Sequence, residues 1–358
     1  MWPQSHLQKM FSIELPIVQA PMAGSSGLEM ALAVSDAGGL GSLACAPLEA
    51  SDLRKLLLAT KAKSSKSFNV NFFAHREVAG DNDTAWLNRL FGYFKELDIE
   101  PPHSLSSGSI KPFDETRCQV IEEIKPAIVS FHFGLPDEAL VRRIKTVGAK
   151  VISSATTVDE AVWLVEHGCD AIIAQGIEAG GHRGMFLTDN VHTQIGTLSL
   201  VPQIVDAVDV PIIAAGGIAD GRTIAAALAL GASGVQCGTA YLFTNEATIS
   251  DAYHRALQSA SSLGTSVTNV FSGRPTRTIM NRVMRETGPM ADDAPAFPRG
   301  FSAMGPLQAK AEKNGSRDFS AHYCGQSSRL GYLTSAGQLT HNLAADALRC
   351  MNQLIKPV

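Results

Sequence analysis

The sequence predicts an α/β protein whose main part is a TIM barrel, that is a (β/α)8 barrel, with a smaller helical appendage. Short apolar runs alternate with longer segments of helical period, and this alternation occurs eight times between about residues 17 and 240. Such alternation indicates a parallel sheet with right-handed crossovers, and roughly 30 residues per unit suits a barrel. Glycine-rich turns follow several of the apolar runs, at the strand ends where barrels carry their chemistry.

The predicted strands are short runs of β-branched and small apolar residues. They lie at 17–20, 39–43, 68–71, 128–131, 150–153, 171–174, 212–214 and 234–236. The predicted helices between them lie at 28–36, 49–60, 136–147, 158–167, 198–207 and 221–230. Asp159 and Glu160 favour a helix start, and Gly168 favours the end of the same helix. An open, doubly wound sheet is the alternative, but no GxGxxG motif follows the first strand.

Two regions do not follow the repeat. Residues of about 75–125 carry Gly, Pro, Ser and charge with one amphipathic piece at 84–97, which predicts an insertion after the third strand. Residues of about 245–358 lack strand patterns; we expect helices there at 249–261, 277–285, 305–313 and 343–354, and a proline-rich loop at 290–298. We therefore expect a barrel domain at 1–243 and an α-helical appendage at 244–358 that covers the active site.

Composition excludes several classes of protein. The 358 residues include 30 basic and 34 acidic ones without long runs, which argues against a nucleic-acid binder or a membrane anchor. The six cysteines form no CxxC pair, so we expect reduced thiols in a cytoplasmic protein, with neither disulfides nor a zinc site. No signal peptide or membrane helix is predicted. We expect a monomer or homodimer.

Candidate ligand-binding residues follow the first and third strands. Ala20, Pro21 and Met22 form a turn of small residues that lets backbone N–H groups approach a flat ligand. Asn71 lies near the end of its strand and points the same way as Asn69, since strand side chains alternate. An ordinary tight turn and a capping asparagine are the respective alternatives.

The stretch QGIEAGGHRG at 175–184 is the most informative part of the chain. It follows the strand at 171–174 directly, and its glycines surround Glu178, His182 and Arg183. We expect a mobile loop that presents an imidazole over the barrel mouth, where histidine serves proton transfer near neutral pH. His182 is the predicted catalytic residue.

Glycine turns after the last two strands predict a phosphate site. Gly217 lies in the first turn, and Gln236, Cys237, Gly238 and Thr239 form the second. Backbone N–H groups at helix N-termini bind phosphate in many barrels, and the Thr239 hydroxyl would add a donor. We interpret the Cys237 side chain itself as a small buried filler. Packing alone is the alternative explanation of either turn.

His132 ends the fourth strand and is a candidate for substrate binding, with a structural role in the core as the alternative. The histidines show no HxH or HExxH spacing, so no metal site is predicted.

Taken together, these segments resemble the nitronate monooxygenase family, formerly called 2-nitropropane dioxygenases. The resemblance rests on PIVQAPMAG at 16–24, SATTVDEA at 154–161, QGIEAGGHRG at 175–184, AAGGIADG at 214–221, GVQCGTAYL at 234–242, SGRPTRTIMN at 272–281 and CGQSSRL at 324–330. QGxEAGGHxG is specific to this group of flavoproteins, whereas the two phosphate turns occur in many barrels.

The resemblance implies an FMN-dependent oxidoreductase that uses O2 to convert alkyl nitronates, such as propionate 3-nitronate, into carbonyl compounds and nitrite, a detoxification reaction. Its cofactor-binding residues would be Ala20, Pro21, Met22, Asn71, Gln175, Gly180, Gly217, Gln236, Cys237, Gly238 and Thr239. His182 would be catalytic, and His132 and His182 would contact the substrate. The family's aromatic pocket residues cannot be placed, because only 6% of residues are aromatic.

Two other functions stay open at this point. An FMN-dependent NAD(P)H reductase of the same fold, acting on an enoyl-acyl-carrier-protein or a quinone, shares GGH-type loops. A non-catalytic barrel that binds a phosphate-bearing ligand belongs to a different class; His182 and Glu178 in a flexible loop count against it.

Overall fold

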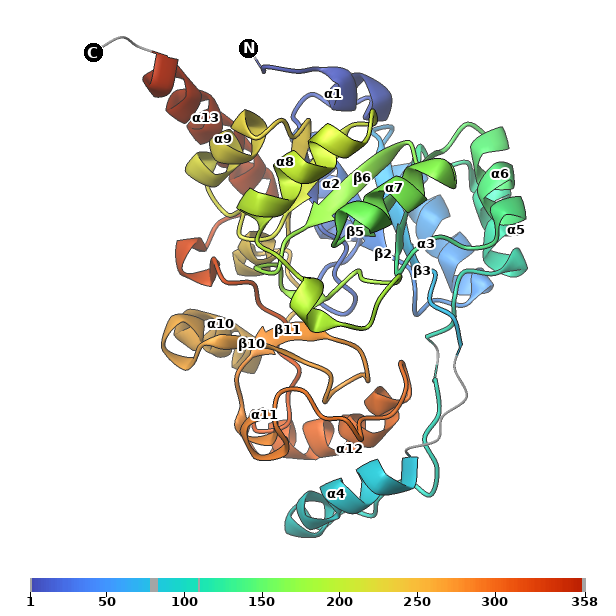
Figure 1. The fold of residues 1–358 in the computed structure, drawn as a ribbon, viewed down its shortest axis with the longest axis vertical. Helices are drawn as coiled ribbons and strands as arrows, with labels where there is room; N and C mark the ends of the chain where they lie inside the picture. The colour runs from blue at the N-terminus through green and yellow to red at the C-terminus, as the bar shows by residue number, and fades with distance from the viewer. Residues whose placement is uncertain (1, 78–82, 109, 356–358) are drawn as a thin grey trace.

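A closed barrel of eight parallel strands forms the centre of the molecule (Figure 1). The computed structural model describes residues 2–77, 83–108 and 110–355. The barrel strands are β1 (Ile17–Gln19), β2 (Gly41–Ala44), β3 (Phe68–Phe73), β4 (Ile128–His132), β5 (Lys150–Ala155), β6 (Ala171–Gln175), β8 (Ile212–Ala215) and β9 (Gly234–Cys237). Their order is β1-β9-β8-β6-β5-β4-β3-β2, and backbone hydrogen bonds between β1 and Leu40 close the ring. All eight predicted strands and the predicted barrel are confirmed.

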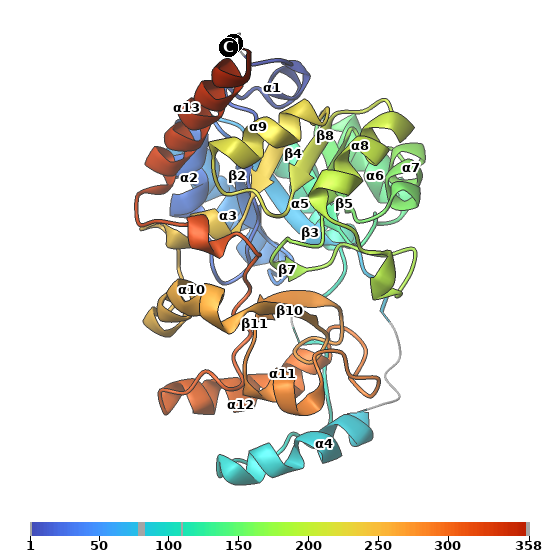
Figure 2. The same cartoon turned by 60° about the vertical axis from the view of Figure 1, so that its left-hand side comes forward.

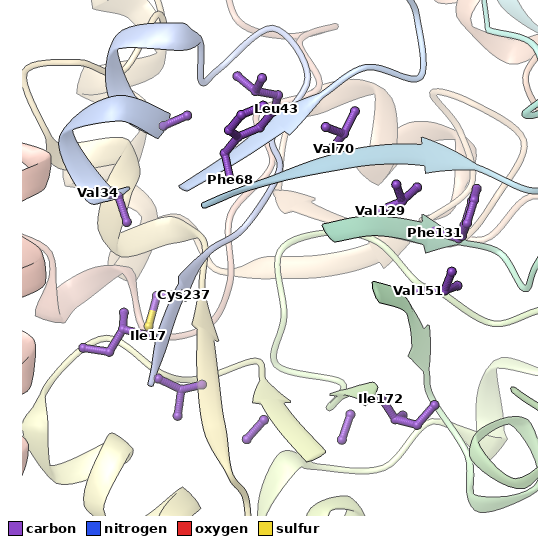
Figure 3. Close-up of a cluster of buried hydrophobic side chains, with 14 of the residues drawn as sticks. Ile17, Val34, Leu43, Phe68, Val70, Val129, Phe131, Val151, Ile172 and Cys237 are labelled. Atoms are coloured by element: carbon purple, nitrogen blue, oxygen red, sulfur yellow. The ribbon is translucent and has the colours of Figure 1, made fainter. Parts of the chain in front are cut away.

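Eight helices surround the barrel. They are α2 (Leu28–Asp36), α3 (Ala50–Lys63), α5 (Glu115–Ile124), α6 (Glu138–Thr146), α7 (Val158–Glu166), α8 (Thr197–Ala207), α9 (Gly221–Ala229) and α13 (Ala336–Ile355). The outward side chains of the strands pack against them in the main hydrophobic core, part of which is drawn in Figure 3. The predicted helix pattern is therefore confirmed, with ends shifted by a few residues.

The short helix α1 (His6–Phe11) closes the N-terminal end of the barrel. Its Leu7 and Phe11 are buried against inward-facing residues such as Val18 and Ile213. No helix was predicted in this segment, because six residues are too few to show a period. Because α1 covers the N-terminal end, a ligand site in the barrel must open at the C-terminal end of the strands.

The last helix corrects the predicted domain division. We expected the helix at 343–354 to belong to the appendage, but α13 packs against α9 and α2 and completes the barrel's outer ring (Figures 1 and 2). Gly221 makes this possible: a Cβ atom there would overlap the backbone of Asp346. Hence the chain leaves the barrel after β9 and returns to it.

A second layer, here called the cap layer, lies below the C-terminal end of the barrel (Figure 2). It contains α4 (Asp83–Glu96), α10 (Asp251–Leu263), α11 (Arg282–Thr287), α12 (Gly300–Lys313) and the strands β10 (Thr265–Thr268) and β11 (Thr276–Ile279). Trp86, Leu90 and Phe94 of α4 share a hydrophobic core with residues around Phe271 and Met304. The insertion and the C-terminal region thus build one structure.

Two expectations for these regions are wrong. The C-terminal region does contain strands: β10 and β11 pair antiparallel, and the predicted helix at 277–285 divides into β11 and α11. Both strands are rich in β-branched residues, TSVT in β10 and TRTI in β11, which favours β structure, but four-residue strands give a weak signal. The insertion also ends earlier, since α5 belongs to the barrel's outer ring. The short 3-10 helices are η1 (Val191–Thr193), η2 (Thr239–Phe243) and η3 (Ser328–Leu330).

Among the described residues, no helix is both long enough and apolar enough to cross a membrane.

Candidate active site

One cavity of about 380 Å³ lies between the C-terminal ends of the barrel strands and the cap layer. It gathers the predicted site residues from six separate parts of the sequence. Those that line it are Ala20, Pro21, Met22, Asn71, His132, Gln175, Gly180, His182, Gly217, Gln236, Gly238 and Thr239. Its size lies in the range of small-molecule sites.

Cys237 is the one predicted residue that the structure places elsewhere. Side chains alternate along β9, so Gln236 lines the cavity whereas Cys237 packs beside Ile17 in the hydrophobic core (Figure 3). The thiol is fully buried, and burial raises its pKa to about 12. The Cys237 side chain therefore does not line the cavity, and its interpretation as a buried filler is confirmed.

His182 stands in the two-residue strand β7 (Gly181–His182), which pairs with β11 of the cap layer. Its Nε2 atom lies 2.9 Å from the Ser272 hydroxyl. Burial, together with smaller effects of the nearby His132 and Arg274, lowers the pKa of His182 to about 3. The imidazole is accordingly neutral at neutral pH and can either donate or accept a proton.

His132 lines the same cavity and holds the backbone of His182. Its Nε2 atom lies 3.0 Å from the His182 carbonyl oxygen, which can only accept, so Nε2–H donates there. Nδ1 then accepts from the Ser154 hydroxyl at 3.0 Å. Both ring nitrogens of His132 are therefore engaged in positioning His182, and burial lowers the pKa of His132 to about 4.

The loop that carries His182 is fixed from beneath by Arg183, contrary to the mobile loop that we expected. The Arg183 side chain is fully buried and donates to the carbonyl oxygens of Gln175 at 2.7 Å and Gly176 at 2.9 Å. Its Nε atom donates to Gln194. Burial lowers the pKa of Arg183 to about 9, which still leaves the guanidinium charged at neutral pH.

Gln175 and Glu178 complete the support of the loop. The Gln175 amide donates to the His182 carbonyl at 2.9 Å and accepts from the Gly184 N–H at 2.7 Å. Glu178 accepts from the backbone N–H and the hydroxyl of Thr197, at the start of α8. The glycines of this segment thus permit close packing: a Cβ atom on Gly180 would lie 2.5 Å from the Gly325 nitrogen.

The two predicted phosphate turns lie side by side, and a third segment joins them. Gly216 and Gly217 have φ values of 107° and 73°, which L-residues rarely adopt. The Ser327 hydroxyl donates to the Gly217 carbonyl at 2.7 Å, and the Gly325 N–H donates to the Thr239 hydroxyl at 2.9 Å. Gly325 and Ser327 line the cavity, and our residue-by-residue assignment missed them although the CGQSSRL segment drew attention.

An aromatic wall surrounds His182 on the side of the cap layer. Ring centroids lie 5.5–6.3 Å from the imidazole; the rings are those of Phe73, Phe133, Phe297, Phe301 and Tyr323. Sequence analysis missed all five, because they come from four distant segments. Only Phe73 could have been found from the sequence: it follows Asn71 by two residues on β3, so both side chains lie on the same face of the strand.

No group of three or more His, Cys, Asp or Glu side chains suited to a metal ion occurs within the described part of the chain.

Known proteins resemble the chain over almost its whole length. The family model described as nitronate monooxygenase matches residues 4–346. A nitronate monooxygenase from Paraburkholderia phytofirmans is 39% identical over 97% of this chain and 96% of its own. One from Pseudomonas aeruginosa is 40% identical over 94% and 97%.

Solved structures agree with these sequences. A nitroalkane oxidase from Streptomyces ansochromogenes has a TM-score of 0.90 and 36% identity, and the match covers 97% of this chain and 99% of that one. FabK from Thermotoga maritima has a TM-score of 0.73 and 26% identity, with 98% of both chains covered.

Proposed function

The chain belongs to the nitronate monooxygenase family of oxidoreductases, and we propose that it uses FMN and O2 to oxidise alkyl nitronates to carbonyl compounds and nitrite. The observation that carries this proposal is the position of His182. It is a neutral imidazole in a fixed loop, at the wall of a cavity that also holds two glycine turns suited to phosphate.

The residues of the cavity fit a flavin mononucleotide. The glycine turns at Gly217 and Gly238 offer backbone close to the cavity, as phosphate binding needs. The buried Oε1 atom of Gln236 has no hydrogen-bond partner in the described structure, although buried polar atoms are rarely unpaired. Ala20, Pro21 and Met22 would contact the ring, with Asn71 and Gly180 along its polar edges. Bound FMN would supply the electron transfer that no side chain provides.

Ser272 allows His182 to serve either a nitronate or a neutral nitroalkane. An anionic nitronate only accepts hydrogen bonds, so His182 must present Nδ1–H while Nε2 accepts from the Ser272 hydroxyl. Abstraction of a proton from a nitroalkane requires the reverse, with Nδ1 unprotonated and Nε2–H donating to Ser272. The two arrangements differ in the tautomer of the ring, so exchange between them moves the proton from one ring nitrogen to the other as well as rotating the Ser272 hydroxyl, which can serve as donor or acceptor in either case.

The proposed reaction balances with O2 as the oxidant. The carbon–nitrogen bond of the nitronate breaks, nitrite leaves with the nitrogen and its two oxygens, and one oxygen atom from O2 becomes the carbonyl oxygen. Two nitronates therefore balance one O2, and no net proton is consumed.

The test combines a spectrum with an activity. We expect purified protein to carry FMN, visible by absorbance, and to consume O2 and release nitrite with the nitronate of 1-nitrobutane. Colourless protein that gains no thermal stability from added FMN would contradict the cofactor. Rapid anaerobic bleaching of the flavin by NADH or NADPH, without nitronate-dependent O2 uptake, would instead indicate an NAD(P)H-dependent flavin reductase of the same fold.

A further inference from the structure

The part of the cavity beside His182 is unusually poor in positive charge for a site that handles anions. Neither lysine nor arginine lines the cavity within the described part of the chain. Glu178 is the charged residue among the lining side chains, and it is negative. The histidines are neutral, because burial lowers the pKa of His182 to about 3 and that of His132 to about 4.

The charges of Arg183 and Arg274 act on the cavity histidines, but neither side chain lines the cavity. The guanidinium of Arg183 is engaged by backbone carbonyls beneath the loop, and that of Arg274 lies over two aromatic rings. The guanidinium carbon of Arg274 lies 4.4 Å from the ring centre of Phe133 and 5.9 Å from that of Phe297. One of its nitrogens donates to the Met185 carbonyl at 3.3 Å. Arg274 does not belong to the lining residues.

Apolar rings stand in and behind the cavity wall beside His182. Phe73 and Phe301 line the cavity, and Phe301 lies at the start of α12 with its ring 6.0 Å from His182. Phe297 packs against both of these rings at 6.0 and 6.2 Å. Phe133 has a left-handed backbone conformation with φ 71°. This conformation costs about 1 kcal/mol for a residue with a Cβ atom, so the packing around Phe133 must offset that cost to hold the ring in place.

We propose that this enzyme selects nitronates with apolar, uncharged substituents and disfavours those that carry a second anionic group, such as propionate 3-nitronate. The proposal rests on the proposed function and specifies its substrate class. Transfer of a carboxylate from water into a cavity without a cation is unfavourable, whereas alkyl and aryl groups gain from burial against the phenylalanine rings.

The test compares two nitronates of similar length, propionate 3-nitronate and the nitronate of 1-nitrobutane, in the FMN-loaded enzyme. We expect kcat/KM to be at least about tenfold higher for the apolar one, the range in which pocket chemistry discriminates. Equal values, or a preference for propionate 3-nitronate, would overturn the proposal. If the Arg274→Met variant abolished such a preference, Arg274 would be the missed partner of the carboxylate.

A charge introduced at Phe301 provides the converse measurement. Phe301→Lys places an amine at the wall, and we expect it to raise the ratio of kcat/KM for propionate 3-nitronate over the butyl nitronate by about tenfold. The matched variant Phe301→Leu keeps the wall apolar and should leave that ratio within about twofold of the parent. A ratio that rose equally in both variants would show that ring size, and not charge, sets the selectivity.

A binding measurement separates this proposal from the proposed function. Calorimetric titration at neutral pH with the parent nitro compounds, uncharged 1-nitrobutane and 3-nitropropionate with its carboxylate ionised, reports the preference of the cavity without turnover. Absence of nitronate oxidation together with tighter binding of 1-nitrobutane would reject the proposed function and support the apolar pocket. Tighter binding of 3-nitropropionate would reject the apolar pocket.

Discussion

The barrel side and the cap-layer side of the cavity differ in the kind of contacts that hold them. The barrel wall is made of backbone and of polar side chains that donate to backbone carbonyls: Gln175 and His132 both donate to the His182 carbonyl, and Arg183 supports the wall from beneath. The cap-layer wall is made of rings that touch without hydrogen bonds, such as Phe297 and Phe301. Directional bonds hold a catalytic group in one geometry, whereas ring packing tolerates replacement. The difference suggests that the barrel wall determines the chemistry and the cap wall the choice of substrate.

Loss of Arg183 tests the barrel wall most severely. Arg183→Met leaves the Gln175 and Gly176 carbonyls and Gln194 without their donor in a fully buried place. We expect the free energy of unfolding in urea to fall by about 3 kcal/mol. Arg142→Met is the matched control, since that side chain is 65% exposed, and should change stability by less than about 0.5 kcal/mol. Equal losses in both variants would contradict a special role of the buried guanidinium.

Replacement of His182 tests the chemistry that the barrel wall supports. We expect His182→Asn to keep FMN bound and to lower turnover by about 10²-fold or more, the usual contribution of an acid–base group. The measurement is O2 consumption with both a nitronate and the corresponding nitroalkane, alongside the flavin absorbance per protein. Full activity on both substrates would rule out the proposed role.

Acidification should weaken the junction of the two walls. Burial lowers the pKa of His75, His132 and His322 to about 4 and that of His182 to about 3. The unfolded chain therefore binds protons that the native chain does not between about pH 6.5 and these values. Stability is full above pH 6.5 and falls as the pH decreases, by about 1 kcal/mol per histidine between pH 7 and 5.5. The free energy of unfolding in urea, measured at pH 7 and pH 5.5, gives this loss. An unchanged free energy would mean that the pKa values of these histidines in the native protein are close to those in the unfolded chain.

Removal of the Ser272 hydroxyl is the mildest change and lies where the two walls meet. Ser272→Ala deprives His182 Nε2 of its partner, so the imidazole loses its preferred proton position. We expect kcat/KM to fall by about tenfold, with FMN binding retained. Ser272→Thr keeps the hydroxyl and should restore most of the activity. If the Ala variant also lost FMN, the serine would be a structural residue and not a positioning one.

The same division explains which site residues could be predicted from sequence. Several site residues lie at or soon after the C-terminal ends of strands: Gly217, Gln236, Gly238 and His182. Because a barrel brings all these strand ends to one place, the strand pattern alone predicted that the residues meet. The aromatic wall depends on how α12 and the segment before it fold back over the mouth. Nothing local in the sequence around Phe297 or Phe301 indicates that contact.

Arg183 illustrates a second limit. Glycines around a charged residue favour an exposed, flexible loop when only the local sequence is considered. The structure buries the guanidinium because three carbonyl or amide oxygens from β6, its following turn and Gln194 converge on it. Such convergence involves residues up to 11 positions apart and cannot be recognised from composition.

By itself, the sequence determined the barrel, the family and the residues on the barrel side of the cavity, since periodicity and strand-end motifs are local properties. The tertiary structure alone decided that α13 returns to the barrel, that the strand β7, which carries His182, pairs with β11, and that aromatic rings stand beside His182 in a cavity whose described lining holds no lysine or arginine. These features arise from contacts between segments about 90 or more residues apart, whose energies depend on packing that no short stretch of sequence encodes.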